Sequence, residues 1–237
     1  MRLKDFLDIS EAPDLQTFES RLVQFAQNLD FGIVSGALVV EHSVGRATSF
    51  HLGNTPKAFA STFVDTDIGR RDPVLRRLKR LSAPFVYDQS MYVREQAADL
   101  WETQAAFGYH TGVAMALHLP GGKHFVMGVD RDKPLPSDDG AVTRLMADLQ
   151  LLAVHAQETA IRLFLPKAYG MERLPELTIQ EIEILKWTSV GKSRWDVSEI
   201  LGVTERAVRY HMQKILVKLG AVSPVDAVLR AKTLGLI

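Results

Sequence analysis

Apolar residues recur along the first 130 positions in patterns that predict a helix followed by several short strands. In residues 16–28 they return every three or four positions, which is the period of an amphipathic helix. Alternating or continuous apolar runs then predict strands, at residues 33–41, 48–52, 85–87, 112–119 and 124–130. The last two runs flank a Pro-Gly-Gly turn at Pro120–Gly122, so we expect them to pair as a hairpin.

Two helical stretches, residues 73–80 and 93–107, lie between the strands. They do not give the regular strand–helix alternation of a doubly wound parallel sheet. We therefore expect an antiparallel sheet flanked by helices, in a chain of the α+β class.

A long helix is predicted from Ser137 to Leu163. Ser137 is suited to cap it, and Asp138 and Asp139 lie in the first turn, where the helix dipole favours negative charge. Its apolar positions follow in steps of three, four or seven: Val142, Leu145, Leu149, Leu152, Ala156 and Leu163. Such a stripe either packs on the sheet or pairs with the same helix of a second copy.

Residues 166–175 contain two prolines, a glycine and no apolar period, which indicates a linker. We place domains at 1–165 and 176–237 on either side of it. The second domain shows four helix starts, after the capping residues Thr178, Ser193, Thr204 and Ser223. A three-residue turn containing glycine joins the helices at 194–201 and 205–219, which is the spacing of a helix-turn-helix in an all-α four-helix domain.

The helix at 205–219 has an apolar face and an opposite polar face. The apolar face carries Val208, Met212, Ile215 and Leu219. Arginine and glutamine can bond base edges in the major groove, and lysine suits phosphates. We expect the DNA contacts to come from Thr204, Arg206, Arg209, Tyr210, Gln213, Lys214 and Lys218. A solvated basic face with no partner is the alternative.

Composition narrows the class of protein. The 237 residues are 46% hydrophobic and 24% charged, as in ordinary globular proteins, and the net charge is zero. Nucleic-acid binding must therefore rely on local charge, and residues 176–237 carry nine Lys/Arg against seven Asp/Glu. The absence of cysteine excludes disulfides and thiolate sites. With no signal peptide and no apolar run long enough to cross a membrane, we expect a cytoplasmic protein.

Enzyme and metal-site motifs are absent from the sequence. Gly191-Lys192-Ser193 lacks the first glycine of a phosphate-binding loop, because position 186 is lysine. The seven histidines show no pair at metal-ligand spacing. His118 and His124 flank the hairpin turn and could face each other, but we interpret them as lone surface histidines. We expect no catalysis, no metal and no cofactor.

Residues 177–237 resemble the tetrahelical DNA-binding domain of the LuxR family of transcription regulators. Glu181, Leu185 and Gly191 stand at the positions that the family shares most strictly, and His211 and Lys218-Leu219 also match. Ala207 replaces the usual threonine at the start of the recognition helix. The resemblance implies a dimer on DNA, to which the last helix contributes.

Asp72-Pro73 precedes a predicted helix. From these residues alone, the simplest interpretation is that Asp72 caps the helix and Pro73 lies in its first turn. Together with Tyr87 and Gly112, however, Asp72-Pro73-Val74 resembles the autoinducer-binding domain of the same family. The resemblance implies an α/β/α sandwich in which Asp72 accepts a hydrogen bond from the amide N–H of an acyl-homoserine lactone.

The sequence departs from this family at four ligand-site positions. Phe59 replaces a tryptophan that donates to the lactone carbonyl, Phe63 and Thr55 replace tyrosines, and Gly128 stands where some members have a hydroxyl residue. These departures indicate an atypical lactone or another small apolar signal. Phe59, Phe63 and Tyr87 would suit a flat or bulky ligand, or would simply fill the core.

From these patterns we expect a ligand-responsive, homodimeric regulator that binds an inverted-repeat operator on double-stranded DNA. The alternative is a LuxR-type regulator whose N-terminal domain is a dimerisation or protein-interaction module with no ligand. A phospho-acceptor domain fits less well, because it needs a parallel sheet with aspartates clustered at strand ends.

Overall fold

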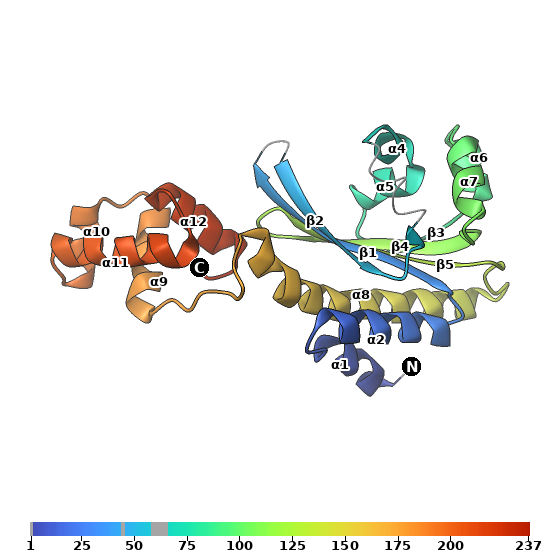
Figure 1. The fold of residues 1–237 in the computed structure, drawn as a ribbon, viewed down its shortest axis with the longest axis horizontal. Helices are drawn as coiled ribbons and strands as arrows, with labels where there is room; N and C mark the ends of the chain where they lie inside the picture. Colours follow the sequence, from blue (N-terminus) through green and yellow to red (C-terminus); the bar gives the residue numbers. More distant parts are fainter. Residues whose placement is uncertain (1, 44–45, 58–65) are drawn as a thin grey trace. The chain divides into compact units, whose positions relative to one another are not determined.

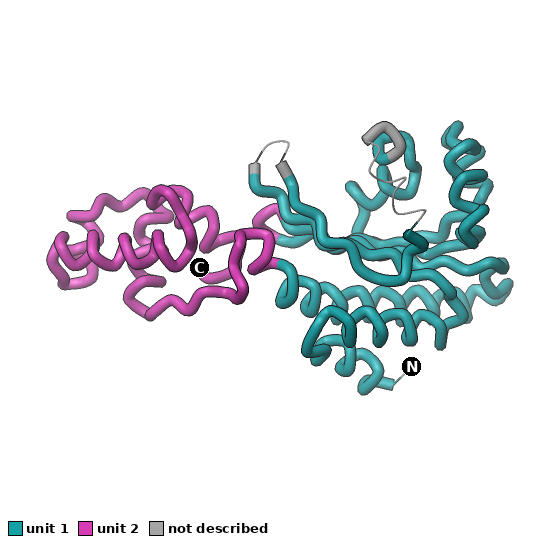
Figure 2. Tube along the Cα trace, viewed as in Figure 1, with its two compact units in different colours: residues 1–119, 123–164 teal, residues 120–122, 165–237 magenta. Residues whose placement is uncertain are grey.

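A computed structural model describes residues 2–43, 46–57 and 66–237. The chain forms two compact units, residues 1–119 with 123–164 and residues 120–122 with 165–237 (Figure 2). Phe59 and Phe63, two of the ligand-site residues expected from the sequence, lie outside the described residues.

The first unit is built on a five-stranded sheet with the order β2-β1-β5-β4-β3. The strands are β1 (Ile33–Ser43), β2 (Arg46–Gly53), β3 (Phe85–Asp88), β4 (Thr111–Leu119) and β5 (Lys123–Arg131). Every neighbouring pair is antiparallel, and β4 and β5 form the expected hairpin. His118 and His124 are opposite each other in it with their Nδ1 atoms 2.8 Å apart, so the expectation of separate histidines is wrong.

Helices cover both faces of the sheet, as Figure 1 shows. One face carries α1 (Leu3–Ser10), α2 (Leu15–Asn28) and α8 (Asp139–Ala168). The other carries α4 (Thr66–Arg71), α5 (Pro73–Leu78), α6 (Gln89–Arg94) and α7 (Ala98–Ala105). The expected α/β/α sandwich with an antiparallel sheet is therefore confirmed.

The stripe on α8 is core, because Leu149, Leu152 and Ala156 are fully buried. Two details of the predicted helix are wrong. The cap is Asp138, whose Oδ2 accepts a hydrogen bond from the amide of Ala141 at 2.6 Å, and not Ser137. The helix also continues through Pro166 to Ala168, into the predicted linker, because Phe164 to Pro166 are buried and hold its last turns.

The N-terminal helix α1 is fastened to α8 by polar contacts between residues far apart in the sequence. Thr159 Oγ1 donates to the carbonyl of Ile9 at 2.9 Å, and Arg162 donates to the carbonyl of Ala12 at 2.5 Å. Phe6 and Ile9 are buried beside these contacts. The helix α1 is thus part of the core layer.

The single helix predicted at 93–107 is wrong, because the structure has α6 and α7 with a break between them. Gln96 adopts a positive φ of 56° at the break. The Ala97 amide still bonds the Tyr92 carbonyl at 2.8 Å, which closes the end of α6. The break turns α7, and the rings of Tyr92 and Trp101 contact each other in a tilted arrangement with their centroids 5.4 Å apart.

The second unit contains the four expected helices, α9 (Ile179–Ser189), α10 (Arg194–Leu201), α11 (Glu205–Leu219) and α12 (Pro224–Thr233). Each has the expected capping residue, with a side-chain oxygen that accepts the amide hydrogen three residues later. Gly202 and Gly220 end α10 and α11 in the left-handed conformation that glycine tolerates best. Among the described residues, no helix is both long and apolar enough to cross a membrane.

Candidate functional site

The sheet face toward α4–α7 has small residues at its centre. Residues opposite each other in an antiparallel pair share a face, so the register places Ser35 beside Gly128 and Gly128 beside Ala114. Ala37 and Ala116 extend the same face through Val126. Because these side chains are short, they fill little of the space between the sheet and the helices that cover this face.

Tyr87 and Asp130 meet across this face over Gly112. The register pairs Tyr87 with Gly112 and Gly112 with Asp130, and the Tyr87 hydroxyl donates to Asp130 Oδ1 at 2.5 Å. A Cβ at Gly112 would lie 2.2 Å from Tyr87 Cζ and 2.6 Å from Asp130 Oδ1. Glycine is required here because the tyrosine ring passes through that space. Burial, and next the charge of Asp130, raise the pKa of Tyr87 well above its usual value.

Asp72 caps α5 and also faces the interior. Its Oδ1 accepts the amide hydrogen of Leu75 at 2.9 Å, which confirms the capping interpretation. Its Oδ2 lies 3.2 Å from the Tyr92 hydroxyl, and that hydroxyl lies 3.2 Å from Gln104 Oε1. Asp72 Oδ2 thus has the Tyr92 hydroxyl as a donor, and the atom of this group without a partner among the described residues is Gln104 Nε2. Burial raises the pKa of Asp72 despite these bonds.

An apolar cluster surrounds these polar groups. It joins helices α5–α7 to strands β3 and β4 through Val74, Leu78, Tyr87, Met91, Tyr92, Ala97, Trp101, Ala114 and Ala116. These apolar surroundings disfavour the charged forms of Asp72 and Tyr92, so burial is the main cause of their raised pKa values.

A second cluster of polar side chains consists of Ser35 on β1, Thr55 after β2 and Tyr109 before β4. Ser35 Oγ is 2.7 Å from Thr55 Oγ1 and 3.1 Å from the Tyr109 hydroxyl. Thr55 is therefore engaged by a neighbouring serine on the same sheet face as Gly128. Burial raises the pKa of Tyr109, which keeps its hydroxyl protonated.

The structure brings four of the sequence candidates to one side of the sheet: Asp72, Tyr87, Gly112 and Gly128. Thr55 joins them through Ser35. Sequence reasoning missed Asp130, Tyr92 and Gln104, which are all buried. The strand period offered one signal, because Asp130 follows Gly128 by two residues and must share its face.

The polar face of α11 is exposed, as its sequence pattern predicts. Six of the seven candidates, Thr204, Arg206, Arg209, Tyr210, Gln213 and Lys214, are exposed, whereas Val208, Met212, Ile215 and Leu219 are buried. The Lys214 ammonium lies 4.6 Å from the centre of the Tyr210 ring. Thr204 Oγ1 accepts the amide hydrogen of Ala207 at 3.2 Å, so it also caps the helix.

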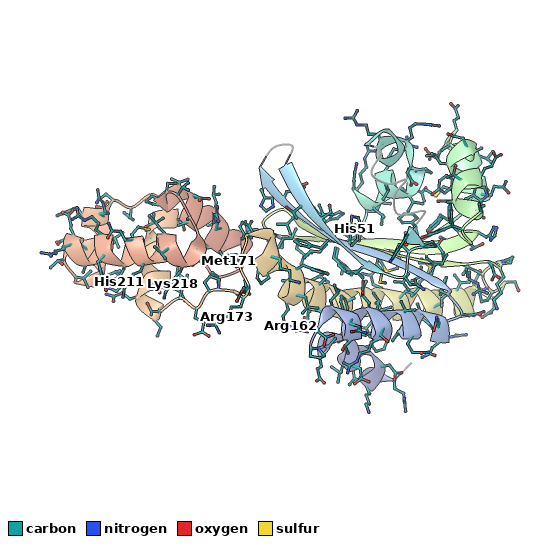
Figure 3. All side chains as sticks on the ribbon, viewed as in Figure 1. His51, Arg162, Met171, Arg173, His211 and Lys218 are labelled. Carbon is teal, nitrogen blue, oxygen red and sulfur yellow. The ribbon has the colours of Figure 1, made fainter. Side chains whose placement is uncertain are left out.

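Lys218 has a partner inside its own unit. Its Nζ lies 2.7 Å from Oε2 of Glu181, which is 1% exposed, and 3.0 Å from the carbonyl of Glu176. Figure 3 labels Lys218 and His211 on α11. Burial opposes ionisation of Glu181, but the bonds from Lys218 and from Thr178 lower its pKa below the usual value. The structure thus places Lys218 in a salt bridge between α11 and α9.

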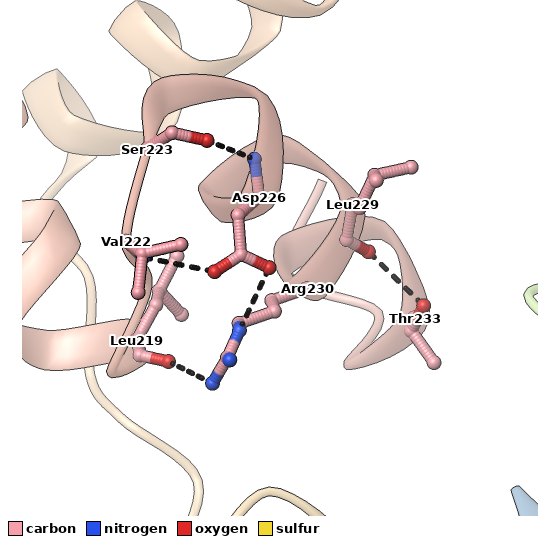
Figure 4. Close-up of polar contacts among 7 residues, drawn as sticks. All are labelled: Leu219, Val222, Ser223, Asp226, Leu229, Arg230 and Thr233. Carbon is pink, nitrogen blue, oxygen red and sulfur yellow. Dashed lines mark hydrogen bonds and ion pairs between the residues drawn. The ribbon is translucent and has the colours of Figure 1, made fainter. Parts of the chain in front are cut away.

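The last helix is joined to α11 by Arg230 (Figure 4). Asp226 Oδ1 accepts from Arg230 Nε at 3.1 Å, and Arg230 donates from Nη1 to the Leu219 carbonyl at 3.1 Å. The Arg230 side chain therefore satisfies a carbonyl at the C-terminal end of α11, where cations are favoured. Val222, Val225 and Leu229 remain exposed on and before α12.

Comparison with protein families matches both units of this chain. Residues 14–160 match the autoinducer binding domain, and residues 175–231 match the bacterial regulatory proteins of the luxR family. The chain belongs to the LuxR family. It is a LuxR-type quorum-sensing transcription regulator with an autoinducer-binding domain and a DNA-binding helix-turn-helix.

Relatives of this LuxR-family chain are named as transcription regulators and not as enzymes. It is 30% identical to the quorum sensing-dependent transcriptional regulator RpaR of Rhodopseudomonas palustris, over 100% of this chain and 95% of that protein. A crystal structure of Escherichia coli SdiA has a TM-score of 0.78 at 22% identity, covering 99% of this chain and 96% of SdiA. SdiA in complex with octanoyl-rac-glycerol has a TM-score of 0.76 at 22% identity, covering 98% and 93%. The likeness to SdiA shows the fold alone.

Proposed function

We propose that this protein binds an N-acylated or N-aroylated homoserine lactone, or a related small apolar signal, between the sheet and helices α5–α7. In this proposal ligand binding controls how a homodimer binds an inverted-repeat operator. The observation that carries the proposal is the carboxylate of Asp72, which is buried in an apolar layer above the small residues of the sheet.

Asp72 would accept the amide N–H of the signal through Oδ2. Its other oxygen is already occupied by the amide of Leu75. A buried carboxylate needs donors, and Oδ2 has one in the Tyr92 hydroxyl at 3.2 Å. A ligand amide would supply a further donor, so the ligand and the carboxylate would stabilise each other.

The departures from the usual family pattern argue for an unusual signal. Phenylalanine at positions 59 and 63 offers no hydrogen-bond donor, and Thr55 is engaged by Ser35. A site without a donor discriminates poorly for the carbonyl that the donor would bind. A Cβ at Gly128 would be in ordinary contact with the Tyr87 hydroxyl at 3.7 Å, so this point of the sheet has room for one more small group. Tyr87 and Gly112 would shape this space from β3 and β4.

The DNA contacts would come from the exposed face of α11. Arg206, Arg209 and Gln213 would reach base edges, while Thr204, Tyr210 and Lys214 would contact the backbone. Lys218 is left out of this proposal because Glu181 and the carbonyl of Glu176 already hold its ammonium. Two copies of the helix in a symmetric dimer would select two inverted half-sites.

The dimer would use the outer face of α8. Leu151 and Val154 are 42% and 40% exposed there, although the rest of that helix packs on the core. A second copy would cover both side chains at once, because they lie three residues apart on one helix face. Leu151→Asp combined with Val154→Asp should shift the protein to monomer in analytical ultracentrifugation. An unchanged sedimentation coefficient would place the dimer contact elsewhere.

The experiment that tests the ligand proposal compares Asp72→Asn with Asp88→Asn. Both aspartates cap short helices, but Asp88 is exposed at the start of α6. Thermal shift and reporter assays would use straight-chain, branched and aromatic lactones together with octanoyl-rac-glycerol. Only Asp72→Asn should weaken the response.

If no compound stabilises the protein, and both variants affect only folding, the alternative of a ligand-independent dimerisation module is correct. If octanoyl-rac-glycerol alone stabilises it, the signal is not a lactone. Each result therefore distinguishes a different account of the first unit.

A further inference from the structure

The carboxyl of Asp130 is buried with one oxygen unused. The side chain is 1% exposed, and its Oδ1 accepts the Tyr87 hydroxyl at 2.5 Å. Its Oδ2 is buried and has no hydrogen-bond partner among residues 2–43, 46–57 and 66–237. Buried polar groups are nearly always paired, so an unpaired carboxyl oxygen needs an explanation.

The unused oxygen belongs to the same side of the sheet as the proposed ligand site. Asp130 pairs with Gly112 on β4 and with Ile33 on β1, and it follows Gly128 by two positions. Burial raises the pKa of Asp130, and the negative charge of Asp72 adds to the rise.

A structural role for Asp130 as half of an ion pair does not fit its surroundings. Arg131 is the adjacent strand residue and therefore points to the other face of the sheet, where it pairs with Asp30 at 3.4 Å. The titratable groups around Asp130 are Tyr87, Tyr92, Tyr109 and Asp72, and none of them is a cation. Burial, and then the charge of Asp72, raise the pKa of Asp130 to about 7.

We propose that Asp130 Oδ2 bonds a hydroxyl group of the signal, so that the site prefers lactones that carry a hydroxyl on the acyl chain. This rests on the function proposed above. A hydroxyl suits this position in either state of the carboxyl, because it can donate to a carboxylate and accept from a carboxylic acid. A ketone can only accept and a methylene can do neither, so both leave an ionised Oδ2 unpaired.

The test uses four lactones of equal chain length with the full-length protein. They are N-octanoyl, N-(3-oxooctanoyl), N-(3-hydroxyoctanoyl) and N-(8-hydroxyoctanoyl) homoserine lactone, and their dissociation constants would be measured by titration calorimetry at pH 8. We expect at least one hydroxylated lactone to bind about tenfold more tightly than the octanoyl compound, the scale of one hydrogen bond to a charged group. The 3-oxo compound should gain nothing.

Asp130→Asn separates hydrogen bonding from shape. The asparagine carbonyl can still accept from Tyr87, but its NH₂ group replaces the unused oxygen with an obligate donor. Both a hydroxyl and a ketone can accept from this NH₂ group, so the variant should gain affinity for the 3-oxo compound and lose the preference for hydroxylated over 3-oxo lactones, which a purely structural role would not produce. Asp132→Asn, an exposed acid two residues further along, is the control and should behave as the parent.

Each outcome decides between the two proposals. If all four lactones bind with equal affinity, or the octanoyl or 3-oxo compound binds best, the inference about Asp130 is wrong and the lactone site stands. If no lactone binds, the proposed function fails and this inference fails with it. The parent series alone decides the question if Asp130→Asn does not fold.

Discussion

The ammonium of Lys218 lies 2.7 Å from a carboxylate oxygen of Glu181, a residue on another helix that is almost completely buried. The contact joins the C-terminal end of α11 to the first turn of α9, where Glu181 also completes the capping box with Thr178. One carboxylate thus satisfies the start of one helix and fixes the end of another.

Lys218→Ala should therefore act on stability more than on DNA recognition. It should reduce the free energy of unfolding of the second unit by about 1 to 3 kcal/mol, because it removes a hydrogen bond between charged groups and leaves Glu181 buried. Urea denaturation followed by circular dichroism measures this loss. Lys214→Ala is the matched control, since Lys214 is exposed and its ammonium lies over the ring of Tyr210 on the same helix.

The stabilisation from the contact between Lys218 and Glu181 should be lost as the pH falls. The pKa of Glu181 is lowered in the folded state from its usual value of 4.5. The unfolded chain therefore binds the proton first as the pH falls, and the stabilisation is present above about pH 4.5 and is lost below it. Glu181→Gln should flatten this part of the stability curve between pH 5 and pH 3. An equally steep curve in the variant would contradict the assignment.

Arg209→Ala should weaken binding to the specific operator by about 1 to 3 kcal/mol and relax base preference at one position of each half-site. Lys186→Ala removes the same charge from an exposed position on α9 and should change affinity far less. Fluorescence anisotropy with an operator selected from random DNA would measure both. If the selected sites were single and not palindromic, the symmetric dimer would be excluded.

Gly112→Ala should lower the stability of the folded protein much more than Gly128→Ala, although both glycines lie on the same sheet face. A Cβ at Gly112 would overlap the Tyr87 ring at 2.2 Å, whereas a Cβ at Gly128 would touch its hydroxyl at an ordinary 3.7 Å. We expect a loss of about 1 to 3 kcal/mol or more for the first variant and a small change for the second. Thermal unfolding of the two proteins checks the difference.

Asp130 should make the folded protein less stable as the pH rises toward neutrality. Its pKa is raised to about 7 from the usual 3.8, because burial and the charge of Asp72 disfavour its charged form. Between these values the folded state binds the proton more tightly, so the free energy of unfolding falls with rising pH by at most about 1.4 kcal/mol per unit. Asp130→Asn should remove this fall. Parallel stability curves for parent and variant from pH 4 to 7 would contradict the prediction.

The second unit could be predicted almost completely from its sequence because its signals are local. Each helix begins at a capping residue and two of them end at a left-handed glycine, so three to five neighbouring residues define all four starts and two of the ends. The exposed face of α11 follows from the helical period alone. The partner of Lys218 did not follow, because Glu181 lies 37 residues away in the chain.

The layered architecture of the first unit could be predicted from the sequence, whereas the contacts in its candidate ligand site could be predicted only in part. Strand runs and the hairpin turn gave the antiparallel sheet, but the break at Gln96 has no glycine or proline to mark it. Asp72 was found through local and family signals. The role of Asp130 depends on Tyr87, which is 43 residues away and reaches it only because Gly112 lies between them. Such a contact depends on strand order, which a single sequence does not reveal.

The attachment of α1 to α8 has a consequence for how the chain folds during synthesis. Ile9 and Thr159 are bonded across 150 residues, and Arg162 reaches Ala12 across the same interval. At about 5 to 20 residues per second, the ribosome delivers the partner of α1 roughly ten to thirty seconds after α1 itself. During that delay Phe6 and Ile9 have no α8 to cover them, so a nascent chain stalled before residue 139 should bind a chaperone through its first turns.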